Sequence, residues 1–116
     1  MLQLSKVNAS EQAFTRIAEI LPYQMPLLRE LDLSSNVMNF FTFDYLQIAF
    51  KSGRSNLQKL NLSNTHMNEK SGIDLMDAIL SFSKVKTLNI SRNMDLGYKF
   101  SAYVLVMLKN IEGYTL

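Results

Sequence analysis

Residues 28–36 read LRELDLSSN, and this pattern of apolar and polar residues recurs along the chain at a nearly constant spacing. It returns as LQKLNLSNT from residue 57 and as VKTLNISRN from residue 85. The aligned residues Leu33, Leu62 and Ile90 are 29 and 28 positions apart, and Leu4, in LQLSKV, lies 29 positions before Leu33. A fixed period of this length is typical of a protein built from stacked repeats.

A second apolar pattern follows each of these stretches. Leu46 and Phe50 follow the copy at residue 28, and Leu75 and Ile79 hold the equivalent positions after the next copy. Apolar residues four apart, with small or polar residues around them, indicate a helix with one buried face. Each repeat is therefore predicted to be a short strand, a turn and a helix of about three turns.

The stretch LxxLxLxxN resembles the leucine-rich repeat, and its period with a full helix resembles the ribonuclease-inhibitor-like subclass. The resemblance covers the whole chain, with repeats at approximately 1–27, 28–56, 57–84 and 85–112. It implies an α/β fold: a right-handed, curved solenoid of about four repeats, with parallel strands on the concave face and helices on the convex face. One strand–helix unit cannot bury its apolar face alone, so the units stack.

Composition narrows the class of protein. The chain has 116 residues, enough for one domain, and 47% of them are apolar. No apolar run approaches the ~18 residues of a membrane span. A net charge of +2 gives no argument for nucleic acid. The absence of cysteine excludes a disulfide scaffold and a thiolate metal site.

The strand residues that point away from the core form the predicted binding surface. Side chains alternate along a strand, so Leu31 and Leu33 point inward and their neighbours point to the concave face. Acidic residues in the second repeat give way to basic residues later, which suits a protein partner better than a polyanion; solvated charges without a partner remain the alternative. The predicted surface consists of Glu30, Asp32, Ser34, Lys59, Asn61, Ser63, Thr87, Asn89 and Arg92.

Asn36, Thr65 and Asn93 end the strand pattern at equivalent positions. The resemblance implies that such an asparagine is buried and that its amide group bonds the backbone of the turn and of neighbouring repeats. An amide offers both donors and an acceptor, whereas threonine can still make one such bond. These residues are predicted to form a structural ladder rather than to contact a ligand.

The stretch NFFTFDYLQIAF at residues 39–50 is unusually aromatic. Phe43 fits the buried face of the expected helix. Phe40, Phe41 and Tyr45 fall where the family pattern has polar residues. They either pack against an adjacent repeat or form an exposed aromatic hot spot for a partner.

Residues suited to catalysis or to metal binding are few. His66 is the only histidine and no cysteine exists, so a nucleophilic triad and a zinc site of the usual kinds lack ligands. Asp74 and Asp77 lie one turn apart on a predicted helix and are interpreted as a solvated face. We therefore predict no catalytic residue, no metal and no cofactor.

Two further features concern the context of the chain. Sequons at Asn61 and Asn89 arise from the repeated strand itself and are interpreted as accidental, which favours a cytoplasmic protein.

Met1 takes the position of Glu30 in the repeat, and Leu116 takes that of Leu31, so the chain starts and stops at nearly the same phase of the repeat. This phase predicts an excerpt of a longer array, or ends covered by another chain; a small self-standing domain is the alternative.

The function predicted from these features is a non-catalytic scaffold for protein–protein interaction. Its partner is expected to bind through the concave face and the rim between strands and helices. Fold alone does not define function, so alternatives stay open. They are a GTPase-activating or actin-regulatory leucine-rich-repeat protein, or a structural spacer in a larger assembly. Arg92 near the rim would matter for the GTPase-activating alternative.

Overall fold

The computed structural model describes residues 2–4, 11–25, 27–100 and 102. Short strands and longer helices alternate along the chain. Residues 98–100 and 102 are also helical, and the rest of the helix expected in the fourth repeat lies outside the described residues. The elements are β1 (Leu2–Gln3), α1 (Glu11–Gln24), β2 (Glu30–Asp32), α2 (Phe40–Lys51), β3 (Lys59–Asn61), α3 (Glu69–Phe82) and β4 (Thr87–Asn89).

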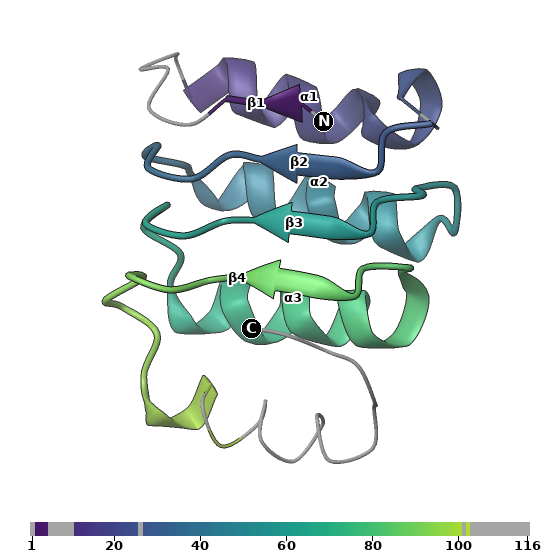
Figure 1. Ribbon diagram of the computed structural model, residues 1–116. Coiled ribbons are helices and arrows are strands. Elements are labelled where there is room, and N and C mark those ends of the chain that lie inside the picture. The colour runs from purple at the N-terminus through teal and green to yellow at the C-terminus, as the bar shows by residue number, and fades with distance from the viewer. Residues whose placement is uncertain (1, 5–10, 26, 101, 103–116) are drawn as a thin grey trace.

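The strands form one parallel sheet in the order β1-β2-β3-β4, which is their order in the sequence. Leu31 pairs with Leu60, and Leu60 with Leu88, so the repeated leucines lie in register. Figure 1 shows α1, α2 and α3 side by side behind the sheet, while the front of the sheet carries no helix in the described part of the chain. The α/β class and the parallel arrangement of strands predicted from the sequence are confirmed.

Asparagine begins two of the helices at equivalent positions. Asn39 caps α2, and its Oδ1 accepts the Thr42 backbone N–H at 3.2 Å. Asn68 caps α3, and its Oδ1 accepts the Ser71 backbone N–H at 2.8 Å. Such a bond pairs one of the amide groups that a helix leaves free at its start. The repeat therefore specifies where α2 and α3 begin as well as where the strands lie.

The core lies between the sheet and the helices. Leu31, Leu60 and Leu88 enter it from the strands, and each is at most 2% exposed. The helices contribute the apolar residues four apart that the sequence indicated. These are Leu46 and Phe50 from α2 and Leu75 and Ile79 from α3, all fully enclosed.

Buried polar side chains hold the turns that follow the strands. Asn93 Nδ2 donates to the carbonyls of Leu62 (3.0 Å) and Ile90 (2.9 Å). Its Oδ1 accepts the backbone N–H groups of Thr65 (2.9 Å) and Met67 (3.1 Å). Because these bonds run between β4's turn and β3's turn, Asn93 ties two neighbouring repeats together.

Asn36 and Thr65 occupy the equivalent positions of the earlier turns and are also buried. Asn36 Nδ2 donates to the carbonyls of Leu4 (2.8 Å) and Leu33 (3.1 Å). Thr65 Oγ1 donates to the Leu62 carbonyl at 2.8 Å. Asn93 Oδ1, in the turn after β4, accepts both the Thr65 hydroxyl at 3.3 Å and the Thr65 backbone N–H at 2.9 Å.

The turns also share a backbone conformation. Ser35, Asn64 and Arg92 have φ angles of 58°, 52° and 59°, in the left-handed region. Asparagine adopts this region more readily than serine or arginine, because its side chain can bond its own backbone. Arg92 is therefore held at the turn in a conformation that costs free energy.

Candidate functional site: the open face of the sheet

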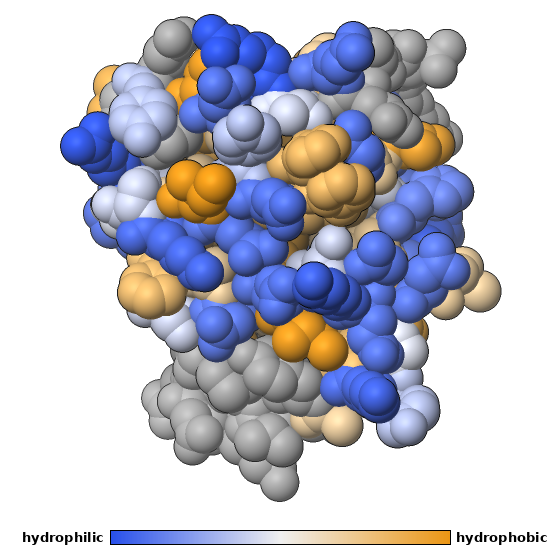
Figure 2. Space-filling view, turned by 180° about the vertical axis from the view of Figure 1, so that it is seen from behind, coloured by the Kyte–Doolittle hydropathy of each residue, from blue (hydrophilic) through white to orange (hydrophobic). Residues whose placement is uncertain are grey.

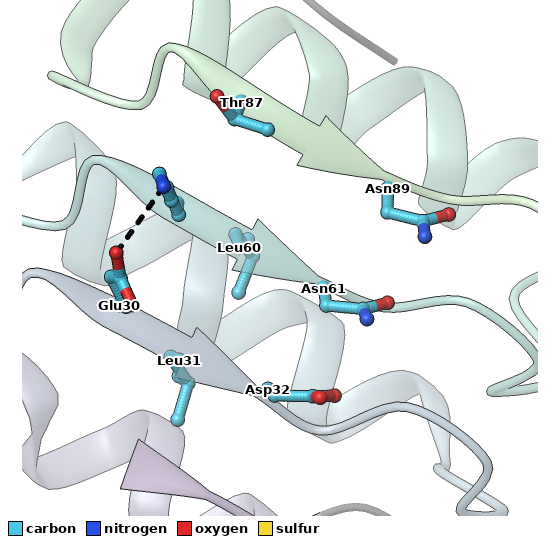
Figure 3. Close-up of a pocket in the computed structure, with 8 residues that line it drawn as sticks. Glu30, Leu31, Asp32, Leu60, Asn61, Thr87 and Asn89 are labelled. Carbon is cyan, nitrogen blue, oxygen red and sulfur yellow. Dashed lines mark ion pairs between the residues drawn. The ribbon is translucent and has the colours of Figure 1, made fainter. Parts of the chain in front are cut away.

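The face of the sheet opposite the helices contains a shallow depression of about 280 Å³. Figure 3 shows polar side chains from three adjacent strands along this depression. The side chains of Leu31 and Leu60, between them in sequence, belong to the buried core. The strands supply these side chains by alternation, because each inward leucine leaves its two neighbours on the open face. The lining residues are Glu30, Leu31, Asp32, Lys59, Leu60, Asn61, Thr87 and Asn89.

Asp32, Asn61 and Asn89 form a row across the ends of β2, β3 and β4 (Figure 3). In each, Oδ1 accepts the backbone N–H of the serine two residues later, at 2.9, 3.0 and 3.0 Å respectively. We call these three residues the Asx row. The shared bond holds each side chain in one orientation.

The same bond determines which polar atoms of the Asx row remain for a partner. A backbone N–H can be accepted only by oxygen, so the Nδ2 groups of Asn61 and Asn89 are the atoms left over. Asp32 keeps its second carboxylate oxygen. The row therefore presents one negatively charged acceptor followed by two amide donors, on strands about 4.8 Å apart.

A second row lies at the start of the strands. Lys59 Nζ is 3.4 Å from Glu30 Oε1, and the two side chains are 62% and 35% exposed. An exposed pair of this kind contributes little to stability. It does change the charge predicted for this face, because the acidic and basic residues of β2 and β3 compensate each other. Asp32 is left as the charge without an ion pair among the lining residues described.

Ser34 is buried, whereas the sequence predicted that it faces outward from the sheet. It is 6% exposed, and its carbonyl accepts Asn36 Nδ2 at 3.0 Å. The reason is that strict alternation ends with the strand at Asp32, and the chain then turns toward the buried Asn36. Ser63 is half-buried. Thr87, Asn89 and Arg92 are exposed.

Arg92 stands apart from the Asx row, beside a second hollow of about 190 Å³ at the turn edge. Asn64, His66, Met94 and Asp95 line the same hollow. Met94 is 92% exposed and was not predicted as a surface residue of interest.

The described residues contain no group of three or more histidine, aspartate or glutamate side chains placed to hold a metal ion.

The three aromatic residues predicted as a possible hot spot fall into two groups. Phe40 and Phe41 are 54% and 52% exposed, and their ring centroids are 4.1 Å apart. Tyr45 is half-buried and packs against the core. Figure 2, seen from the helix side, shows hydrophobic patches separated by hydrophilic side chains. Phe40 and Phe41 begin α2, which lies behind the sheet, so they belong to the helix layer and not to the sheet face that carries the Asx row (Figure 1).

Comparison with known proteins does not assign the chain to a family. No family model matches the sequence, and no curated protein matches it. Within the described part of the chain, no helix is both long and apolar enough to cross a bilayer.

Proposed function

We propose that the chain is part of a leucine-rich-repeat solenoid of the ribonuclease-inhibitor-like kind, and that its open sheet face binds another protein without catalysis. The period of 28 to 29 residues supports the family proposal, together with the matched register of Leu31, Leu60 and Leu88. The buried turn residues support it as well, since Asn93 links successive repeats through its amide. In this proposal the sheet face is the concave surface.

The observation that carries the binding proposal is the Asx row. Three side chains on adjacent strands are held by the same local hydrogen bond, so their outward atoms are already ordered before a partner arrives. Ordering side chains is one of the costs of association, and a surface that is already ordered avoids part of it. Such a row suits specific recognition better than a set of freely rotating surface chains.

The chemistry of the row indicates what the partner presents. A segment lying across the strands would place a donor, such as a lysine or arginine side chain, against Asp32. It would place acceptors, such as backbone carbonyls, against the amides of Asn61 and Asn89. The Glu30–Lys59 pair borders this path and fixes orientation more than affinity.

The test uses a double variant that alters only the outward atoms. Asn61→Asp with Asn89→Asp keeps the oxygen that accepts the serine N–H, and replaces both outward donors by acceptors. Proteins captured by the wild-type chain are identified by mass spectrometry and their affinities measured with purified components. A sheet-face partner is lost or weakened at least tenfold by the double variant, because two amide donors are removed and two carboxylates face the partner's acceptors instead.

Asp77→Asn, in helix α3, is the matched control. It exchanges the same two side-chain types in reverse, aspartate to asparagine, at a position away from the sheet. The control variant retains the partner. If the double Asp variant binds every captured protein as tightly as the wild type does, the Asx row is not the binding site.

A GTPase-activating role is the second candidate, and the observation in its favour is Arg92. This residue is exposed at the turn edge and held in a left-handed conformation, and strained residues cluster at functional sites. An arginine supplied in trans can stabilise the transition state of GTP hydrolysis. Single-turnover hydrolysis by a panel of small GTPases tests this role; acceleration that is lost in Arg92→Ala supports it, and no acceleration removes it.

A further inference from the structure

The exposed aromatic pair on α2 is not required by the fold. The helices align by their caps, Asn39 and Asn68, which places Glu69 and Lys70 of α3 at the positions of Phe40 and Phe41. Lys70 is exposed, as Phe41 is. The same position in the next repeat is therefore charged and solvated, so packing of this architecture does not need a phenyl ring there.

Other apolar residues of α2 pack its core-facing side, and Phe40 and Phe41 take no part in that packing. Phe43, Leu46 and Phe50 are each at most 1% exposed, and they fill the space between α2 and the sheet. Ile48, two turns after Phe41, is also exposed, at 56%. Large apolar side chains left in water are costly, and a group of them on one helix face marks an interaction surface.

A hollow with a negative balance of charge adjoins this apolar face. It has a volume of about 310 Å³, lies between α2 and α3, and includes Phe40 in its wall. Asp44 and Asp74 line it from the two helices, and Lys70 is its one cation among the described residues. Neither aspartate belongs to either ion pair found among the described residues, Arg16–Glu19 and Lys59–Glu30.

A ring beside two carboxylates is suited to an arginine side chain. The guanidinium group is planar, so it can stack on a phenyl face and donate to carboxylate oxygens at the same time. The described part of the chain already contains a guanidinium group over an aromatic ring, since the Arg54 guanidinium carbon lies 5.3 Å from the centroid of the Tyr23 ring. Lysine would supply the charge but not the stacking plane.

We propose that the α2–α3 hollow and the Phe40–Phe41 pair together form a second docking site, for a partner segment that carries an arginine beside an apolar residue. The arginine enters the hollow between Asp44 and Asp74 and stacks on Phe40. The apolar neighbour covers Phe41. This site is independent of the sheet-face proposal, because it lies on the helix side of the molecule.

The experiment is a nuclear magnetic resonance titration of the 116-residue chain with two short synthetic peptides. One contains arginine next to leucine, and the other replaces arginine by citrulline, which has nearly the same shape and no charge. The arginine peptide shifts the backbone signals of Phe40, Asp44 and Asp74. The citrulline peptide binds about fivefold or more weakly, because it lacks the charge that the carboxylates and the ring attract.

Variants separate the parts of the site. Asp44→Asn with Asp74→Asn weakens the arginine peptide about fivefold, whereas Lys70→Gln strengthens it by removing a like charge. Phe40→Ser with Phe41→Ser abolishes binding while cooperative unfolding is retained. Glu19→Gln on α1 is the matched control and leaves the affinity unchanged.

Several results would overturn this second site. Equal affinity for the arginine and citrulline peptides would remove the role of the carboxylates. Signal changes confined to the sheet face, or no saturable change at millimolar peptide, would remove the site itself. Concentration-dependent dimerisation that protects Phe40 and Phe41 would show that a second copy of the chain is the occupant instead.

Discussion

Replacing Asn93 by alanine tests whether the buried turn amide holds neighbouring repeats together. The side chain is 7% exposed and makes four bonds of 2.9 to 3.1 Å to backbone groups, two as donor and two as acceptor. A longer donor bond of 3.4 Å reaches the Ser91 carbonyl. Alanine leaves the N–H groups of Thr65 and Met67 and the carbonyls of Leu62 and Ile90 without these partners. A net contribution of about 1 kcal/mol per bond gives about 4 kcal/mol, and water entering the vacated space reduces the expected loss to about 2–4 kcal/mol.

The assay is equilibrium unfolding in urea, followed by circular dichroism. Gln58→Ala is the matched control, because it also removes a carboxamide but from an exposed position. The control is expected to change the free energy of unfolding by less than about 0.5 kcal/mol. Asn93→Ala is expected to lower the midpoint strongly, with an unchanged dependence on urea if unfolding remains two-state.

The reasoning would be refuted if Asn93→Ala lost less than about 1 kcal/mol, since a single unsatisfied buried group costs at least that much. Amide hydrogen exchange gives an independent reading. The Thr65 and Met67 amides, which donate to Asn93 Oδ1, should lose protection more than the amides of the α3 interior. Uniform loss across the chain would indicate general destabilisation instead of a broken link between turns.

Three further predictions concern single positions. Gly72→Ala places a Cβ 2.6 Å from Leu96 Cδ2, so crowding outweighs the gain in helix propensity and thermal unfolding should show a loss of about 1 kcal/mol. Asn68→Ala removes the cap bond to the Ser71 N–H and should cost about 1 kcal/mol in urea unfolding, where Asn68→Ser should restore most of it. Arg92→Gly relieves a left-handed backbone, and a gain of up to about 1 kcal/mol is expected in calorimetry; a loss would show that the arginine side chain stabilises the turn.

The apolar pattern was sufficient to predict the arrangement of strands and helices. Leu31, Leu60 and Leu88 pair because identical spacing in each repeat places identical side chains at the same height of the stack. Leu46 and Leu75 lie on the buried helix faces for the same reason. Such features depend on period alone, and period is visible in one sequence.

The positions of individual side chains on the sheet face depend on where the regular strand ends. Alternation predicted that Ser34 would face outward, but the regular strand ends at Asp32 and the chain bends at Ser35 and Asn36, so Ser34 is buried. A signal for the Asx row was present, because Asp32, Asn61 and Asn89 each precede a serine by two residues. Local hydrogen bonds of this type are common for these residues, yet periodicity does not reveal them.

The exposure of Phe40 and Phe41 could not be decided from the sequence for a different reason. Helical period shows that both residues point away from the strongest apolar face of α2. It does not show whether a neighbouring helix covers them, since coverage depends on the side chains of α1 and α3 as well. The structure resolves this point by leaving both rings half in solvent.

Asparagine residues a few positions apart have different surroundings in the same turn. In β4, Asn89 points outward and accepts the Ser91 N–H, whereas Asn93, four residues later, points inward and bonds the turn that follows β3. Aspartate can replace asparagine at the outward position without losing the accepting oxygen, as Asp32 shows. It cannot do so at the inward position, where the Nδ2 donors are needed by buried carbonyls. The charge of the Asx row can therefore vary between acidic and neutral while the backbone stays the same, so one architecture can present different charges on the open face of the sheet.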